Sequence, residues 1–366
     1  MSEWKDYILE DVVEKFIDYR GKTPTKTTFG IPLMTAKIVK KGRLLEPTEF
    51  IANEDYESWM TRGFPEINDV LLTTEAPLGE VALIKNKNVA LGQRLITLQT
   101  KKDLCDSIFL KYYFQSNEGQ SILQSRASGT TVEGIKSAEL KKIEISLPNL
   151  LDQRAIASVL TSLDDKIDLL QRQNSTLEAI AKTLFRQWFV EEAKEDWEEG
   201  SLADLAQFYN GKSRPKEEVG TIPIYGGNGV LGYTNISNYS EKSIIIGRVG
   251  AYCGSLYFEN KEIWVSDNAL LVKAKIERTT YFLLYLLKTL DLNSMAEGSS
   301  HPLLTQTLLK SIVITIPPIA KIENFDFQLE QIMQKKESNN NQIRTLTALR
   351  DTLLPKLMSG EVRVEM

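Results

Sequence analysis

The segment Leu140-Lys-Lys-Ile-Glu-Ile-Ser-Leu-Pro148 recurs without a gap as Leu309-Lys-Ser-Ile-Val-Ile-Thr-Ile-Pro317. The shift between the two copies is 169 residues. At the same shift, Ser128-Gly-Thr-Thr131 aligns with Glu297-Gly-Ser-Ser300. Matches that keep one order along a chain are the signature of a repeated structural module. The sequence therefore predicts a tandem duplication.

The earlier parts of the two copies match in the same order. Gly30-Ile-Pro-Leu33 aligns with Thr221-Ile-Pro-Ile224, and Asp69-Val-Leu-Leu-Thr73 aligns with Ser243-Ile-Ile-Ile-Gly247. Near the start of each copy, at a shift of 193 residues, the matching residues are Trp4, Leu9 and Asp11 against Trp197, Leu202 and Asp204. Because the shift falls from 193 to 169, the second copy is shorter by about two dozen residues.

A long helical stretch follows each of the two repeated prolines. Residues recur every seven positions on two adjacent rows, with alternating steps of four and three, which is the a/d pattern of a coiled coil. In the first stretch the seam residues are Ile156, Leu160, Leu163, Ile167, Leu170, Asn174, Leu177, Leu184 and Trp188. In the second stretch they are Phe325, Leu329, Ile332, Lys336, Asn339, Ile343, Leu346, Leu353 and Leu357.

Each seam carries polar residues near its middle, Asn174 in the first and Lys336 and Asn339 in the second. A buried polar seam residue costs stability but fixes register and partner orientation. A frayed or solvent-filled position explains the same residues equally well. In either case, two helices with matching seams are expected to pack on each other within one chain. Antiparallel packing of ~40-residue helices would separate the two copies by up to ~60 Å.

The parts that precede the helices, called heads below, are less regular. Short β-branched runs predict strands at 69–74, 80–84, 94–98, 243–246 and 269–272. One amphipathic helix is predicted in each head, at 108–126 and at 278–295. The predicted fold class is α+β. Two tandem heads, mostly β with helices, are joined by two long helices in an intramolecular antiparallel coiled coil, with an internal pseudo-twofold repeat.

Composition sets broad limits on the class of protein. The 366 residues are enough for two domains, and 42% hydrophobic and 25% charged residues are ordinary for a globular protein. The sequence shows no signal peptide, and its longest apolar run, 281–287, is too short to span a bilayer. We therefore expect a soluble, cytoplasmic protein with no membrane partner. The net charge of −5 is concentrated at 150–199, so the near-neutral heads neither support nor exclude nucleic-acid binding.

Residue types suited to catalysis or metal binding are scarce. Cys105 and Cys253 are far apart and lack CxxC spacing, so both are predicted to be small buried hydrophobes. His301 is the only histidine, which leaves no histidine pair for a metal site. The acidic cluster Asp164-Asp165-Asp168 is predicted to lie on the solvated face of the coiled coil. Tyr225-Gly-Gly-Asn-Gly229 is predicted to be a plain turn rather than a cofactor loop.

Motifs for nucleotide-driven and methyl-transfer chemistry are also missing. The chain has no GxxxxGK[ST] phosphate loop. Pro317-Pro318 follows isoleucine, whereas amino-methyltransferases carry Asn or Asp before Pro-Pro and an aromatic residue after it. We therefore predict no catalytic residues, no metal ligands and no cofactor in this chain.

What remains is suited to DNA recognition. Flexible loops with cations and hydroxyls can bind phosphates, and an arginine beside a strand can bridge O6 and N7 of guanine. The candidate DNA-binding residues are Lys22, Thr23, Lys37, Lys40, Lys41, Arg43, Arg94, Thr130, Thr131, Lys212, Ser213, Arg214, Asn228, Arg248, Ser299 and Ser300. Taken singly, each is explained at least as well by an ordinary solvated loop. Their occurrence at matching places in two heads favours recognition.

Five segments carry a resemblance to a known family. They are Leu147-Pro-Asn-Leu-Leu-Asp-Gln-Arg-Ala-Ile-Ala-Ser-Val-Leu160, Leu163-Asp164 with Lys166-Ile167, Asn174 with Leu177-Glu178, Leu184-Phe185 with Trp188-Phe189, and Leu353-Leu-Pro-Lys-Leu-Met-Ser-Gly-Glu-Val-Arg-Val364. In them the sequence resembles the DNA specificity subunit of type I restriction–modification enzymes, and the resemblance covers essentially the whole chain. The second copy, Pro317-Pro-Ile-Ala-Lys-Ile-Glu323, lacks the Asp-Gln-Arg stretch, which predicts weaker partner contacts there.

The resemblance implies that each head is a target recognition domain for one half of a split, asymmetric DNA site. The coiled coil would then be a ruler that sets the gap between the halves. The implied partners are double-stranded DNA, methyltransferase (modification) subunits and restriction motor–nuclease subunits. S-adenosylmethionine, ATP and Mg would belong to those partners, which would flip an adenine for N6 methylation. Inserting one helical turn into both helices would lengthen the gap without altering either half.

The resulting domain organisation has four parts. Residues 1–148 and 193–317 form the first and second target recognition domains, 149–192 the first spacer helix, and 318–366 the second spacer helix and C-terminal tail. The predicted function is that of a non-catalytic DNA-recognition subunit. One alternative is a coiled-coil scaffold without DNA specificity, which a salt-dependent DNA shift in the presence of the partner would exclude. Another is a self-contained methyltransferase or nuclease, which methyl transfer by the chain alone would support.

Overall fold

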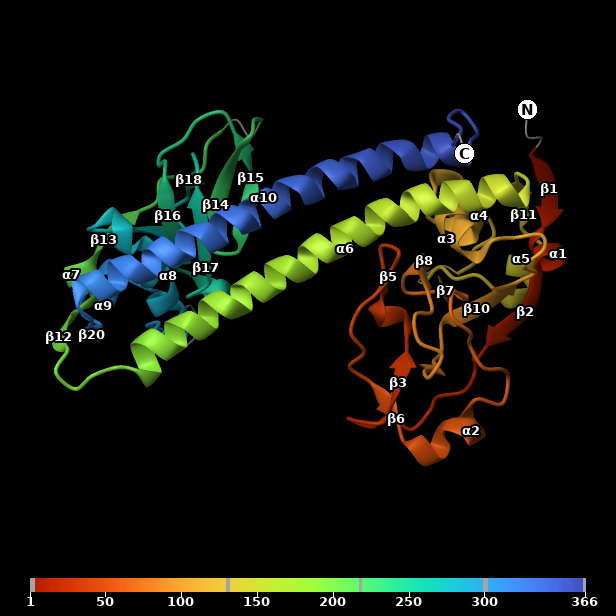
Figure 1. Ribbon diagram of the computed structural model, residues 1–366, viewed down its shortest axis with the longest axis horizontal. Helices are drawn as coiled ribbons and strands as arrows, with labels where there is room; N and C mark the ends of the chain where they lie inside the picture. Colours follow the sequence, from red (N-terminus) through yellow and green to blue (C-terminus); the bar gives the residue numbers. More distant parts are fainter. Residues whose placement is uncertain (1–3, 130–131, 217–218, 299–301, 365–366) are drawn as a thin grey trace. The chain divides into compact units, whose positions relative to one another are not determined.

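The computed structural model describes residues 4–129, 132–216, 219–298 and 302–364 (Figure 1). The chain divides into two compact units. Unit 1 comprises Met1–Leu169 and Gln342–Met366, and unit 2 comprises Leu170–Asn341. Each unit therefore contains one head together with a segment of each long helix.

Unit 1 is built around a four-stranded antiparallel sheet with the order β2-β10-β7-β8. Its strands are β1 (Lys5–Ile8), β2 (Val13–Asp18), β3 (Ile31–Met34), β4 (Val39–Lys40), β5 (Arg43–Leu44), β6 (Phe50–Ile51), β7 (Val70–Thr74), β8 (Leu78–Leu83), β9 (Ala90–Leu91), β10 (Leu95–Thr100) and β11 (Glu144–Leu147). Its helices are α1 (Leu9–Val12), α2 (Tyr56–Trp59), α3 (Ser107–Gln115), α4 (Asn117–Ser125), α5 (Ser137–Lys141) and the first part of α6 (Leu150–Arg186).

Both faces of this sheet are covered, which explains its apolar strands. Every residue of β7 is buried. Val70 and Leu72 pack in one apolar cluster with Phe109 of α3, whereas Leu71 packs in a second cluster with Leu33 of β3. Successive side chains of a strand point to opposite faces, so a strand covered on both faces needs a continuous apolar run.

Unit 2 has a four-stranded antiparallel sheet with the order β13-β19-β16-β17. Its strands are β12 (Glu198–Ser201), β13 (Ala206–Asn210), β14 (Ile222–Gly226), β15 (Gly229–Thr234), β16 (Lys242–Gly247), β17 (Leu256–Asn260), β18 (Trp264–Val265), β19 (Ala269–Ala274) and β20 (Val313–Ile316). Its helices are α7 (Leu202–Leu205), α8 (Thr280–Thr289), α9 (Gln306–Lys310) and the first part of α10 (Ile319–Met358).

The two heads repeat one topology, which confirms the predicted duplication. The pair β1-β11 of unit 1 corresponds to β12-β20 of unit 2, and the four-stranded sheets match strand for strand. Strand β3 pairs antiparallel with β6 and parallel with β9. Strand β14 likewise pairs antiparallel with β15 and parallel with β18. The predicted turn at 225–229 joins β14 to β15, and Gly229 there has a positive φ of 82°.

The predicted strands lie within two residues of β7, β8, β10, β16 and β19, but both predicted head helices have the wrong extent. The first is interrupted at Ser116, whose φ of −69° and ψ of 160° are extended. The Ser116 hydroxyl ends α3 and accepts a hydrogen bond from the Gly119 amide, starting α4. In unit 2 the helix is the shorter α8, which ends at Thr289.

All seam residues predicted on the two long helices are buried or half-buried. Helix α6 continues beyond Arg186 as one π-helical turn, Gln187–Glu191. Within unit 1, Ile156 of α6 packs in the same cluster as Leu357 of α10. Packing along this seam stabilises the two helices, because most of the stability of a helix in a protein comes from burying its apolar face.

Within unit 2 the two helices run antiparallel. The residue number of the partner on α10 falls as the residue number along α6 and its π-helical end rises. Glu178 pairs with Lys336 at 2.5 Å, and Glu192 pairs with Lys321 at 3.1 Å. Between these helices, the buried Asn339 donates from Nδ2 to Oδ1 of Asn174 at 2.9 Å. The middle of the seam therefore holds a hydrogen-bonded polar pair, in which Asn339 is buried and Asn174 is half-buried.

Candidate nucleic-acid interface

Two loops that carry predicted DNA-binding residues meet at one end of the four-stranded sheet of unit 1. Strand β2 ends at Asp18, beside the start of β10. Gln93, just before β10, donates from Nε2 to the backbone carbonyl of Lys22 and to Oγ1 of Thr23, the latter at 2.6 Å. The exposed residues Lys22 and Thr23 are thereby held beside Arg94.

Arg94 links a third loop to this strand end. Its Nε lies 3.0 Å from Oε1 of Glu75, which follows β7. The Arg94 side chain is 56% exposed, and its φ is 64°. A left-handed backbone is uncommon for a residue with a long side chain and is concentrated at turns and functional sites. The loops after β2, after β7 and before β10 therefore form one polar surface.

Two further arginines lie at the same strand end and were not among the predicted residues. Arg20 donates from Nη2 to the carbonyl of Ile135 at 2.8 Å. Arg62 donates from Nη1 to the carbonyl of Arg20 at 3.0 Å. The position of Arg20 before Gly21-Lys22 was a usable signal. Arg62 comes from 42 residues further along the chain and gave none.

Unit 2 gathers its predicted residues at the corresponding strand end. Arg248 follows β16 and donates from Nη1 to Oδ1 of Asn210, the last residue of β13, at 3.3 Å. The exposed residues Lys212, Ser213 and Arg214 come directly after β13. The backbone of Lys212 is fixed by a bond from its amide to the Val265 carbonyl at 3.0 Å.

The turn that carries Asn228 also lies at this end of unit 2. A side chain at Gly247, where β16 ends, would meet the Gly227 carbonyl at 2.5 Å. Gly227 itself faces the carbonyls of Val249 and Asn268. Asn228 is exposed on this turn, so it is presented beside Arg248.

Arg94 and Arg248 occupy reciprocal positions in the two heads. In unit 1 the amide of Thr74 donates to the Arg94 carbonyl at 2.9 Å. In unit 2 the amide of Arg248 donates to the Asn268 carbonyl at 3.1 Å. Thr74 ends β7 and Arg248 directly follows the corresponding strand β16, whereas Arg94 and Asn268 directly precede the paired strands β10 and β19. Each head thus has one arginine in this backbone hydrogen bond. In unit 1 the arginine is the acceptor residue, and in unit 2 it is the donor residue.

The strand-end surfaces are chemically suited to DNA. Exposed lysines and hydroxyls on loops can contact phosphates, which position a protein without reading sequence. An arginine guanidinium presents paired donors that match the acceptors of guanine in the major groove. Hydrogen bonds to neighbouring loops reduce the freedom of Arg94 and Arg248, which lowers the entropy lost on binding.

The remaining predicted cations of unit 1 make other contacts. Lys37 pairs with Glu49 at 3.2 Å. Lys40 is exposed on the hairpin of β4 and β5. In the same hairpin the Lys41 amide donates to Oε2 of Glu80 at 2.6 Å. Arg43 of this hairpin reaches Asp168 of α6 at 2.8 Å. None of these bonds joins the four residues to Lys22, Thr23 or Arg94. The predicted residues Thr130, Thr131, Ser299 and Ser300 lie outside the described residues.

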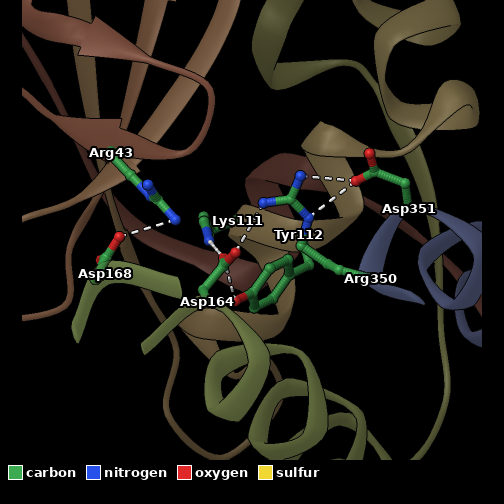
Figure 2. A network of polar contacts seen from close by, with 7 residues as sticks. All are labelled: Arg43, Lys111, Tyr112, Asp164, Asp168, Arg350 and Asp351. Atoms are coloured by element: carbon green, nitrogen blue, oxygen red, sulfur yellow. Dashed lines mark hydrogen bonds and ion pairs between the residues drawn. The ribbon is translucent and has the colours of Figure 1, made fainter. Parts of the chain in front are cut away.

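Asp164 contradicts its predicted place on a solvated helix face. Its Oδ2 accepts from Lys111 Nζ at 3.1 Å and from Tyr112 Oη at 2.7 Å, both on α3 (Figure 2). Its Oδ1 accepts from Arg350 Nη1 of α10 at 2.9 Å. The prediction was wrong because head 1 covers this side of α6. Burial alone would raise the pKa of the Asp164 carboxyl, but Lys111 and the bonds from Arg350 and Tyr112 lower it.

Glu178 forms the corresponding kind of cluster in unit 2. Its Oε1 lies 2.8 Å from Lys288 Nζ of α8, and its Oε2 lies 2.5 Å from Lys336 Nζ of α10. Burial alone would raise the pKa of the Glu178 carboxyl. Hydrogen bonds and the charges of the two lysines outweigh burial and lower this pKa to about 2.

The Asp-Gln-Arg stretch of the first copy has a structural role that the sequence did not reveal. Gln153 is buried and donates from Nε2 to the carbonyls of Leu104 and Pro148, and its Oε1 accepts from the amide of Asp106. It therefore ties α6 to the segment that starts α3. The absence of this glutamine from the second copy removes these bonds between the long helix and the head, and the weaker partner contacts expected there stay a prediction.

In unit 2 another residue of the long helix contacts the head helix. Asp326 of α10 accepts from the amides of Tyr281 and Phe282 at the start of α8, at 2.9 and 2.7 Å. Burial raises the pKa of the Asp326 carboxyl to about 7, against the effect of these two bonds. Asp326 of the long helix thus supplies hydrogen bonds to the head helix in the second copy, which lacks the glutamine.

The described residues show neither metal-binding clusters nor a membrane span. Cys105 and Cys253 are buried and unpaired, as predicted, and burial raises the pKa of Cys105 to about 12. Within residues 4–129, 132–216, 219–298 and 302–364, no three His, Cys, Asp or Glu side chains could hold a metal ion. Along the same part of the chain, every helix is too short or too polar to cross a membrane.

Comparison with known proteins points to one family. The chain is 29% identical to the type I restriction enzyme MjaIX specificity subunit of Methanocaldococcus jannaschii, over 83% of this chain and 79% of that protein. It is 25% identical to the EcoprrI specificity subunit of Escherichia coli, over 79% and 76% of the two chains. The fold resembles the crystal structure of a type I restriction–modification S subunit from M. genitalium, with a TM-score of 0.65, 21% identity and coverage of 97% and 96%.

The model of the type I restriction modification DNA specificity domain matches residues 1–179 and 194–347. These two matches take in both heads, both strand-end surfaces and most of the two long helices. The duplicated α+β heads and their paired helices are therefore shared features rather than peculiarities of one sequence. The chain belongs to the family of type I restriction–modification DNA specificity proteins.

Proposed function

We propose that this chain is the DNA-sequence-recognition subunit of a type I restriction–modification complex, and that each head reads one half of a bipartite site. The observation that carries the proposal is the repeated strand-end surface with its reciprocal arginines, Arg94 and Arg248. Two heads with one topology but different surface residues suit two half-sites of different sequence. Family membership supports the same function.

The strand-end surfaces divide the work between affinity and specificity. Lys22 and Lys212 are exposed cations that suit phosphate contacts, which give salt-dependent, sequence-independent affinity. Arg94 and Arg248 suit contacts with base edges, where one bidentate pair discriminates by ~1–3 kcal/mol. Asn228 is a further exposed amide at the second surface and can pair with adenine.

In this proposal the two long helices set the gap between the half-sites. Proteins that bind two half-sites match their spacing through the geometry of the element that joins the reading heads. A helix rises ~1.5 Å per residue and so converts residue number into distance. The hydrogen bond from the buried Asn339 to Asn174 supports such a role, because a polar seam residue holds two helices in one register.

Partner methyltransferase subunits are proposed to dock beside the starts of the long helices. Unit 1 has a hollow of about 400 Å³ there, lined by Trp4 and Pro148 among others. Unit 2 has one of about 520 Å³, lined by the matching residues Trp197 and Pro317. Two equivalent hollows suit two copies of one partner. The chemistry belongs to the partners: S-adenosylmethionine for adenine N6 methylation, and ATP and Mg for motor–nuclease subunits.

A methylome tests the proposal. The chain would be co-expressed with its cognate methyltransferase subunit in a host without adenine methylation, and modified adenines mapped by single-molecule sequencing. We expect a bipartite motif with a fixed gap that disappears when the chain is omitted. A stable complex that methylates nothing, or methylates without a bipartite motif, would contradict the proposal and favour a protein-binding scaffold.

A further inference from the structure

We propose that Asp164 and Glu178 are positioning residues that fix the orientation of each head on the long helices and thereby restrict the gap that is accepted. The inference rests on the proposed function and deepens it. A ruler measures a distance only if the parts attached to it do not rotate or slide. In each unit, one carboxylate on α6 contacts both the head helix and α10.

The Asp164 cluster is a directional contact in a mostly buried place. Asp164 engages Lys111 and Tyr112 through one carboxylate oxygen and Arg350 through the other. The side chains of Lys111, Asp164 and Arg350 are 5%, 14% and 22% exposed. Asp351 holds the Arg350 guanidinium from its other side, at 2.7 Å from Nη2. The Asp164 carboxylate of α6 therefore bonds to specific side-chain atoms of both α3 and α10.

A second bond one helical turn away suppresses rotation of head 1. Asp168 lies four residues after Asp164 on α6 and pairs with Arg43 at 2.8 Å. Arg43 belongs to the β4–β5 hairpin, whereas Lys111 belongs to α3 (Figure 2). A single contact permits pivoting about its axis. Two contacts from different parts of one head, at two heights on one helix, restrict that pivot.

Unit 2 uses the same principle with other residues. Glu178 contacts Lys288 of α8 and Lys336 of α10. The Lys288 ammonium also lies over the Tyr285 ring, 4.3 Å from its centroid. A second bond joins Lys242 at the start of β16 to Glu330 of α10 at 2.5 Å. Head 2 is thereby fixed to both long helices of its unit.

Stability alone does not account for these clusters. The cost of desolvating two charges often cancels their attraction, and apolar replacements of similar volume are frequently as stable. Apolar contacts are non-directional and permit neighbouring orientations with similar burial. Ion pairs with fixed donors and acceptors instead favour one arrangement. In catalysis, a misplacement of ~1 Å can cost ~100-fold in rate, so a loosened head is expected to alter which target adenines are reached.

The test measures gap selectivity of the complex assembled with methyltransferase subunits. Duplexes would carry both half-sites separated by the natural gap or by gaps one or two base pairs shorter or longer. We compare Asp164→Asn and Glu178→Gln with the controls Asp165→Asn and Glu337→Gln, which change exposed carboxylates on α6 and on α10. We expect the preference for the natural gap to fall at least ~10-fold in both test variants, with the bases of each half unchanged and the controls like wild type.

A second variant guards against simple loss of folding. Lys111→Met, Asp164→Leu and Arg350→Met together replace the charged cluster by apolar side chains, and are expected to retain the melting temperature but not the gap preference. Activity lowered by the same factor at every gap length, in either set of variants, would show a merely structural role and overturn the inference. A wild-type complex that ignores the second half-site would instead contradict the proposed function, so the two failures are distinguishable.

Discussion

Gln153 of α6 and Ile322 of α10 occupy the same position of the repeat, 169 residues apart, yet hold the long helix to its head by opposite means. Gln153 is buried and makes three hydrogen bonds to backbone groups of unit 1. Ile322 is equally buried in the apolar core of unit 2. The hydrogen-bonding role at the second junction has moved to Asp326, one turn later.

Replacing Gln153 by leucine is expected to destabilise unit 1 by about 3 kcal/mol. The change leaves the Asp106 amide and two carbonyls buried without partners, and an unsatisfied buried group costs ~1–3 kcal/mol. The measurement is thermal unfolding together with hydrogen exchange of the amides that start α3. The control Gln331→Leu, on an exposed position of α10, is expected to change stability by less than ~0.5 kcal/mol. Equal unfolding curves for both variants would contradict the role of Gln153.

The Glu178 cluster predicts a specific acid sensitivity of unit 2. The pKa of Glu178 is about 2 in the folded chain, against an ordinary value of 4.5. A carboxyl with a lowered folded pKa stabilises the fold above its ordinary pKa, and this contribution is lost as pH falls from 4.5 towards 2. Glu178→Gln is therefore expected to cost about 3 kcal/mol at neutral pH, and the difference from wild type should vanish near pH 2. Denaturant unfolding at a series of pH values checks this, with the exposed Glu337→Gln variant as the matched control.

Arg94→Ala and Arg248→Ala are expected to relax different halves of the recognised site. Loss of a bidentate contact to guanine costs ~1–3 kcal/mol at one base pair and leaves the other positions intact. Methylome sequencing of each variant would show which half loses a base. The control Arg172→Ala, an exposed arginine on α6, should leave the motif unchanged. Variants that lose activity at every site equally, with no base relaxed, would count against base reading by these arginines.

Insertion of seven residues into both long helices should lengthen the gap between the half-sites. A heptad keeps the phase of the seam, and seven residues at ~1.5 Å each add ~10 Å. This length corresponds to ~3 base pairs at ~3.4 Å per base pair. The insertion sites would follow Leu169 and Asn341, where the units divide. A motif with its original gap would refute the ruler, and a seven-residue replacement without a change of length is the control.

Patterns local in sequence were predicted well. The duplication and the heptad rows appear directly in the residues, so the seam from Ile156 to Leu357 and the matching heads could be derived without coordinates. The break at Ser116 was missed because a serine within an apolar helical pattern also fits a continuous helix. Its hydroxyl instead satisfies the first turn of α4.

Features that depend on distant segments were not predictable. Asp164 has acidic neighbours and a helical pattern that fits solvent exposure, and its burial arises only when α3, some 50 residues earlier, packs on α6. The reciprocity of Arg94 and Arg248 likewise depends on strand pairing, because the two residues follow no common sequence motif. Each arginine could be proposed singly for its chemistry, but their structural correspondence became visible only from the pairing of the strands in the two sheets.

The cap that Asp326 provides has a consequence for the order in which the chain folds during synthesis. Helix α3 carries its own cap, since the Asp106 side chain accepts from the amides of Ile108 and Phe109. Helix α8 relies on a carboxylate that follows Tyr281 by 45 residues. On the ribosome, the cap of α3 can therefore form as soon as that helix emerges. The capping of α8 must wait until the start of α10 has been synthesised, so the amides of Tyr281 and Phe282 stay open to water until then.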